Sequence, residues 1–100
     1  MKPIVDKAEV SIDYPDKAYM GSFGRRAVFD VAADDEGVTI KLSSHGGEKR
    51  EVQIHLHHYL LADVLSGMAV ALKEKLPAND PHRPALASAT QALAAALKDG

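Results

Sequence analysis

The chain has 100 residues, which is enough for one domain to bury a core without help from a metal or a disulfide. Hydrophobic residues make up 46% of the sequence and charged residues 26%, so the composition excludes a disordered chain. The lack of cysteine excludes a disulfide framework, a thiolate nucleophile and a cysteine-based metal site. A formal net charge of −2 provides no general attraction to nucleic acid or to acidic lipid, so either partner would need a local basic patch.

Two segments bear on the location of the protein. The first six residues, Met1 to Asp6, lack the continuous apolar stretch of a signal peptide. The most apolar window, Tyr59 to Leu72, is interrupted by Asp63 and is shorter than the about 20 residues that a membrane-spanning helix needs. We therefore expect a cytoplasmic protein with no membrane anchor, in which this window forms a buried helix.

Alternation of apolar and polar residues predicts an antiparallel sheet over residues 8–56. Val10, Ile12 and Tyr14 alternate with polar neighbours, and the same period of two recurs further along the chain. Polar or glycine-containing turns separate the repeats, and connections this short cannot hold a crossover helix. Residues 18–23 are ambiguous between a loop and a short edge strand, and we favour the strand. The four main strands are expected near residues 9–14, 26–31, 38–43 and 52–56.

The spacing of apolar residues then changes to that of helices. Apolar residues recur every three or four positions over residues 58–76, and a narrower leucine stripe on an alanine-rich background extends over residues 81–98. The prediction is therefore one α+β domain spanning residues 1–100. It consists of a four-stranded antiparallel β-meander followed by two helices packed on one face, in the order β-β-β-β-α-α.

A cluster of histidines closes the last predicted strand. His55 and His57 are two residues apart, so a strand would point both imidazoles to the same side, where they could chelate a divalent metal. A metal site ordinarily needs a third ligand, and this spacing matches no established metal-binding motif. Together with His58, the pair also suits a pH sensor or a solvated strand end. We predict no cofactor and keep His55 and His57 as candidate metal ligands.

Basic residues supply the candidate site for an anion or a nucleic acid. Residues 21–26 form a glycine-bounded loop with two adjacent guanidinium groups, which suits a phosphate group but equally suits a tight turn before a strand. This loop does not match the glycine-rich motifs of nucleotide-binding proteins. The candidate contacts to an anion or a nucleic acid are Arg25, Arg26, Lys41, Lys49 and Arg50.

A four-stranded sheet followed by a helix resembles, in element order only, the Pur and PC4-type single-strand-binding modules. The resemblance implies a sheet that stacks bases on aromatic side chains and binds the phosphates with lysine and arginine. The outward residues of the predicted strands have balanced charge and include no aromatic side chain. Tyr19 and Phe23 could supply stacking only if the ambiguous segment folds over that face.

The first predicted helix carries more apolar surface than one sheet can cover. Gly67, in the interior of this helix, costs about 1 kcal/mol relative to alanine unless close packing uses it. A close helix–helix contact at Gly67 is therefore expected, either inside the chain or between two copies related by a twofold axis. The candidate self-association residues are Leu61, Leu65, Gly67, Met68 and Leu72.

An enzyme is the least favoured class, because the chain has neither a nucleophile-elbow motif nor a pair of carboxylates in an apolar setting. Our leading hypothesis is a non-catalytic interaction or assembly domain that forms a homodimer through the first helix, with an unknown protein as a further possible partner. The alternative is a nucleic-acid-binding module.

Overall fold

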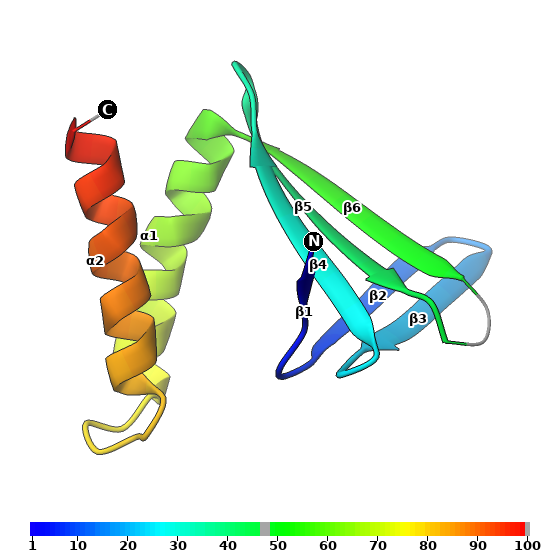
Figure 1. Ribbon diagram of the computed structural model, residues 1–100, viewed down its shortest axis with the longest axis horizontal. Helices are drawn as coiled ribbons and strands as arrows, with labels where there is room; N and C mark the ends of the chain where they lie inside the picture. Colours follow the sequence, from blue (N-terminus) through cyan, green and yellow to red (C-terminus); the bar gives the residue numbers. More distant parts are fainter. Residues whose placement is uncertain (47–48, 100) are drawn as a thin grey trace. The chain divides into compact units, whose positions relative to one another are not determined.

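The computed structural model describes residues 1–46 and 49–99 and places six strands ahead of two helices (Figure 1). This element order confirms the predicted α+β class with a C-terminal pair of helices. The strands are β1 (Lys2–Pro3), β2 (Ala8–Tyr14), β3 (Lys17–Phe23), β4 (Ala27–Ala33), β5 (Gly37–Ser44) and β6 (Arg50–His57), and the helices are α1 (His58–Lys75) and α2 (Arg83–Asp99).

The chain divides into two compact units, residues 1–62 and 63–100. The first unit contains the strands and the first residues of α1, and the second contains the rest of α1 together with α2. The prediction of a single domain over residues 1–100 stays a prediction. Both helices lie close to their expected bounds, since α1 ends at residue 75 and not 76, and α2 begins at residue 83 and not 81.

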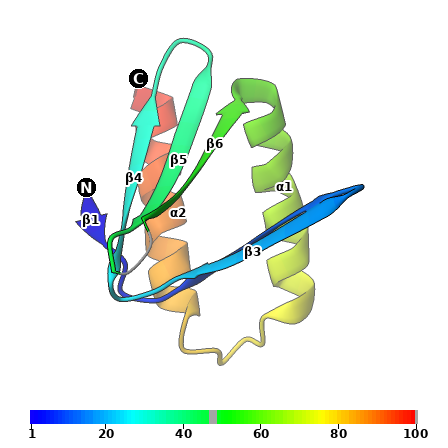
Figure 2. The ribbon, with the colours of Figure 1, turned by 90° about the vertical axis from the view of Figure 1, so that its right-hand side faces the viewer.

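Four strands form one antiparallel sheet in the order β1-β4-β5-β6 (Figure 2). β4, β5 and β6 are consecutive hairpin partners, as the alternation predicted, and their register places Phe29, Leu42 and Val52 in one row across the sheet. Side chains along a strand alternate between the two faces. The face that carries this row is therefore apolar, and Lys41 and Glu51 lie on the opposite face.

β2 and β3 form a separate two-stranded ribbon that runs in a different direction from the sheet (Figures 1 and 2). The ambiguous residues 18–23 thus lie in a strand, as favoured, although this strand does not extend the main sheet. A continuing meander would add β3 to the outer side of β4, but β1 pairs there instead, through Lys2 and Pro3. The N–H of Ile4 also donates to the carbonyl oxygen of Ala27 at 3.0 Å. Proline lacks an N–H donor, so Pro3 suits this edge position.

The hydrophobic core of the first unit is small. Its buried members Ile4, Phe23 and Ala27 are 9, 4 and 2% exposed. They come from the segment after β1, the end of β3 and the start of β4, so the core joins the ribbon to the sheet. The partly buried side chains packed against them are Val10, Phe29, Leu42 and Val52.

The turn between β4 and β5 is fixed by the side chain of its first residue, Asp34. The carboxylate of Asp34 accepts hydrogen bonds from the N–H groups of Glu36 at 2.8 Å and Gly37 at 2.9 Å. The N–H of Asp34 donates in turn to the carbonyl oxygen of Gly37 at 3.0 Å. Gly37 is buried against β6, and a Cβ at this position would lie only 2.0 Å from the carbonyl oxygen of Leu56. Only glycine therefore fits this close approach of two strands.

In the second unit, a short loop joins α1 to α2 and is fixed by hydrogen bonds at both ends. Arg83 donates to the carbonyl oxygens of Leu76 and Pro77, which extend from the end of α1. The carboxylate of Asp80 accepts a hydrogen bond from the N–H of His82 at 2.8 Å, just before α2 begins. These contacts satisfy donors and acceptors that helix ends leave unpaired.

Candidate functional site

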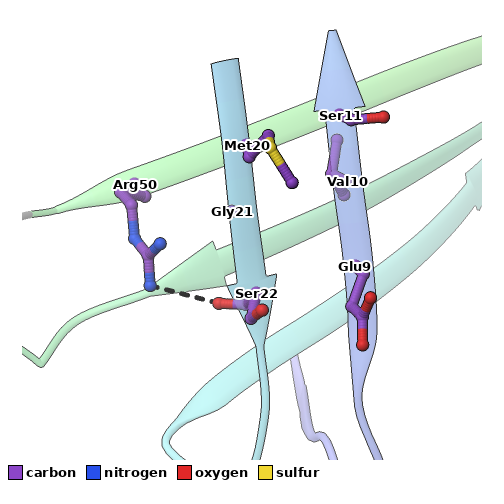
Figure 3. A pocket seen from close by; sticks show the side chains of 7 residues that line it. All are labelled: Glu9, Val10, Ser11, Met20, Gly21, Ser22 and Arg50. Carbon is purple, nitrogen blue, oxygen red and sulfur yellow. Dashed lines mark hydrogen bonds between the residues drawn. The ribbon is translucent and has the colours of Figure 1, made fainter.

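Two hollows lie beside the ribbon where β3 approaches the start of β6. The first has a volume of about 540 Å³ and includes several polar side chains (Figure 3). The second has a volume of about 430 Å³ and a more apolar lining, and it shares four residues with the first. The first is lined by Glu9, Val10, Ser11, Met20, Gly21, Ser22 and Arg50, and the second by Val10, Ile12, Tyr19, Met20, Gly21, Phe23, Lys49, Arg50, Glu51 and Val52.

Arg50 ties the sheet to the ribbon between these hollows. Its Nη2 donates to the carbonyl oxygen of Ser22 at 3.1 Å, the dashed line in Figure 3. Its Cζ lies 5.5 Å from the centroid of the Phe23 ring, within the range of a cation–π contact. A Cβ on Gly21 would approach Arg50 Nη1 to 3.3 Å, so the glycine leaves room for the guanidinium. The guanidinium is therefore held in place, and it has five N–H donors to share between ribbon and ligand.

Three other basic residues from the predicted set lie toward the same end of the sheet. Lys49 immediately precedes β6 and lines the second hollow. Arg25 and Arg26 form the exposed turn between β3 and β4. The side chain of Arg26 lies 3.8 Å from the position of a Cβ on Gly46, so this turn adjoins the residues that directly follow β5. Four of the five predicted basic residues thus come from neighbouring turns and the first residue of β6.

Lys41, the fifth predicted basic residue, is not brought to this end. It lies in the middle of β5 on the face opposite Arg50. Its ammonium group lies 3.5 Å from the carboxylate of Glu51, which also accepts a weak hydrogen bond from Ser43. The alternation in the sequence carried this signal, because Lys41 lies between Ile40 and Leu42, whereas Arg50 is two residues from Val52 and shares its face.

Two tyrosines on the ribbon extend the second hollow, and the sequence analysis did not identify them as a pair. The ring centroids of Tyr14 and Tyr19 are 6.4 Å apart and their planes meet at 82°. Both rings are more than half exposed, at 56 and 54%. The sequence does contain a signal for this pair. A two-residue turn after Tyr14 pairs Tyr14 with Lys17, and this register places Tyr19 opposite Ile12 and diagonal to Tyr14. This apolar side of the ribbon adjoins the apolar face of the sheet, and not its polar face.

The histidines at the end of β6 contact the acidic β4–β5 turn. The ring centroids of His55 and His57 are 4.9 Å apart, so the two rings lie on one side of the strand as predicted. The Nε2 atom of His55 lies 3.5 Å from Asp34, and that of His57 lies 3.9 Å from Glu36. In the part of the chain that the structure describes, no group of three or more histidine, cysteine or acidic side chains is arranged to hold a metal. Metal binding by His55 and His57 stays a prediction.

Asp34 gives this turn a dependence on pH. The N–H groups of Glu36 and Gly37 donate to its carboxylate and lower its pKa below the ordinary value, and His55 adds to the effect. A carboxyl whose pKa is lower in the folded state stabilises the fold above its ordinary pKa of about 4 and loses that contribution as the pH falls further. Replacing Asp34 by asparagine keeps an oxygen acceptor but removes the charge. We expect a lower melting temperature at pH 7 and a smaller further loss on acidification than in the parent chain.

Thermal unfolding followed by circular dichroism between about pH 7 and pH 2.5 measures this effect. Asp16→Asn is the control, because Asp16 lies in the exposed β2–β3 turn. An acid-induced loss of equal size in Asp34→Asn and in the parent chain would contradict the assignment to Asp34.

The predicted self-association residues of α1 separate into two groups. Leu65, Met68 and Leu72 line an apolar groove of about 310 Å³ together with residues of α2. Leu61 is half-buried and lies one helical turn before Leu65. Gly67 does not face the groove. Apart from its chain neighbours and the nearby backbone of α1, no described atom lies within 4 Å of the position that a Cβ on Gly67 would occupy. The close contact expected at Gly67 is therefore not formed within the described chain.

Surfaces of different character thus occur in the two units: a hollow with aromatic and basic side chains in the first, and an apolar groove in the second. Neither described helix combines the length and the apolar composition that crossing a bilayer requires. What these surfaces do is inferred from their own chemistry, since no family model, curated protein or solved structure matches the chain.

Proposed function

We propose that the chain is a non-catalytic assembly domain that forms a homodimer through α1. The observation that carries this proposal is the apolar groove that α1 and α2 line together within the second unit. An exposed apolar helix face is costly in water, because each Å² of apolar surface left exposed forgoes about 25 cal/mol. A second copy of the chain would cover this surface.

The groove between α1 and α2 is the part of this surface with the clearest shape. Its lining is almost entirely apolar and comes from both helices. Residues 65, 68 and 72 of α1 follow the spacing of three and four that aligns side chains on one side of a helix. The lining residues are Leu65, Met68, Ala69, Leu72, Leu86, Thr90, Leu93, Ala94 and Leu97.

The dimensions of the groove suit a second copy better than a small ligand. Helices of 18 and 17 residues are each about 25 Å long, so the groove offers an elongated surface and not an enclosed pocket. A stable interface buries about 800 Å² on each partner. Two grooves that face each other across a twofold axis would bury identical leucine and methionine side chains against one another and form a bundle of four helices.

Replacing Met68 by lysine is expected to convert the dimer into a monomer. Met68 is 51% exposed and lines the groove, so the single chain loses little packing. A dimer of this variant would bury two lysine charges in an apolar interface, because a twofold axis brings the substituted residue of each chain into the same interface. We expect the dimer dissociation constant to rise by at least about a hundredfold. Size-exclusion chromatography with light scattering over a range of protein concentrations measures it.

Val70→Lys is the matched control, since Val70 is 60% exposed on the same helix and does not line the groove. The dimer of this variant and of the parent chain should persist at both low and physiological salt, because apolar contacts are not screened. A parent chain that remains a monomer at every concentration would refute the proposal. Equal dissociation of both variants would place the interface elsewhere on α1.

A further inference from the structure

We infer that the second hollow of the first unit binds single-stranded nucleic acid, with Tyr19 as a stacking surface and Lys49 and Arg50 as phosphate contacts. This function is independent of the proposed dimer, since every residue involved lies within residues 10–52. It combines an exposed aromatic surface with cations in one hollow of about 430 Å³. Binding of this kind pairs base stacking with a positively charged track for the backbone.

The stacking surface is the apolar side of the ribbon beyond the core. Phe23 anchors this side to the sheet, and the side chains of Ile12, Tyr14 and Tyr19 continue it outward. The tyrosines are 56 and 54% exposed, although aromatic rings that serve only the core are normally buried. The edge-to-face contact between the two rings stabilises the ribbon and leaves more than half of each residue exposed. A nucleic-acid base is flat and can stack on either ring, whatever the base sequence of the nucleic acid.

The cations lie where the backbone of such a strand would pass. Lys49 and Arg50 line the same hollow as Tyr19. The guanidinium of Arg50 is already oriented by Ser22 and Phe23, so a phosphate would meet a donor that needs no further ordering. Arg25 and Arg26, in the neighbouring turn, can extend the track to a further phosphate. All four basic side chains belong to exposed residues.

Two acidic residues line the hollows, and each forms an ion pair with a lysine other than Lys49. Glu9, which lines the first hollow, lies 3.2 Å from the ammonium group of Lys7. Glu51, which lines the second, lies 3.5 Å from that of Lys41. Because the formal net charge of the chain is −2, attraction of a polyanion rests on Arg25, Arg26, Lys49 and Arg50 and not on the chain as a whole. The attraction is local, so binding should be weak at physiological salt and stronger at low salt.

Single strands suit this site better than duplexes. A duplex keeps its bases stacked inside and would offer the tyrosines only sugars and phosphates. A polyanion without bases, such as heparin, would use the cations but not the rings. The contribution of Tyr19 therefore separates nucleic-acid binding from general attraction of negative charge.

The test is fluorescence anisotropy of the full chain with a labelled oligothymidine of about 12 nucleotides, titrated at several salt concentrations. Tyr19→Ala should weaken binding by about tenfold, because one stacked base is lost. Tyr59→Ala is its control, since Tyr59 lies on α1 and is 92% exposed. The slope of log affinity against log salt is negative, and Lys49→Glu should reduce its magnitude by at least about 0.7. Lys98→Glu makes the same change of charge on α2 and should leave the slope unchanged.

Binding of the parent chain that depends on Tyr19 and on Lys49, and that a matched duplex or heparin competes for poorly, would support the inference. Circular dichroism of each variant shows whether the fold is kept. Undetectable binding at low salt would overturn the inference, as would equal affinity of the parent and Tyr19→Ala chains or equal competition by heparin. Because Met68→Lys changes only the second unit, it should leave binding to the oligonucleotide unchanged, so failure of one proposal is distinguishable from failure of the other.

Discussion

Replacing Phe23 by alanine is expected to destabilise the first unit strongly. Phe23 is 4% exposed and is the largest of its three buried apolar side chains. Removing a buried phenylalanine ring costs about 3 to 5 kcal/mol, through lost transfer energy and the cavity left behind. A domain of this size has a total stability of about 5 to 15 kcal/mol, so the loss is a large fraction of the whole. The ring also carries the cation–π contact to Arg50, which would be lost with it.

Urea unfolding followed by far-ultraviolet circular dichroism measures this loss as a fall in the midpoint. Tyr59→Ala serves as the control for removing an aromatic ring, because Tyr59 is 92% exposed, and it should change the free energy of unfolding by no more than about 0.5 kcal/mol. Phe23→Ala with a midpoint close to that of the parent chain would show that the ribbon is not anchored through this ring.

Gly37→Ala is expected to separate β5 from β6 at the end nearest the β4–β5 turn. The added methyl group would lie 2.0 Å from the carbonyl oxygen of Leu56 and 2.8 Å from the Cα of His57. Both are backbone atoms, so no side chain can rotate away to relieve the clash. Forcing extra volume into a packed site costs about 1 to 3 kcal/mol, and we expect a value near or above the upper end because the backbone itself must shift.

Thermal unfolding with Gly24→Ala as the matched control tests this expectation. No described atom lies within 4 Å of the position that a Cβ on Gly24 would occupy, outside its immediate neighbours. The control should be neutral or slightly stabilising, since alanine has less freedom than glycine in the unfolded chain. Similar melting temperatures for the two variants would mean that β5 and β6 do not approach each other closely at Gly37.

The strands and helices were predictable because their signals are local. The period-two alternation of Val38, Ile40 and Leu42 is a property of consecutive residues, and it located β5 without knowledge of its partners. The separate ribbon was not predictable in the same way. It depends on β1, where two residues and the N–H of Ile4 occupy the side of β4 that β3 would otherwise extend. Two residues carry no period, so nothing in the sequence identified this strand.

The candidate site was predictable in composition but not in arrangement. Arg25 and Arg26 precede β4, whereas Lys49 and Arg50 lie at the start of β6, so the two pairs are distant in sequence and the β4–β5 hairpin brings them to the same end of the sheet. Lys41 lies on the other face, since it is one residue from Leu42 in β5, whereas Arg50 is two residues from Val52, the partner of Leu42 in β6. The close helix–helix contact at Gly67 was expected because glycine is unfavourable inside a helix unless tight packing compensates for it. Among the described residues, α2 makes no such contact with Gly67.

The position of Ile4 in the core gives the short edge strand β1 an importance beyond its two residues. Terminal residues ordinarily fray, because few contacts hold them and opening costs almost nothing. Here the core that includes Ile4 also contains Val10, Phe29, Leu42 and Val52, so its members extend from position 4 to position 52. Detaching the first strand therefore exposes the centre of the unit and not its edge. We therefore expect opening of β1 and loss of the core to be one cooperative event.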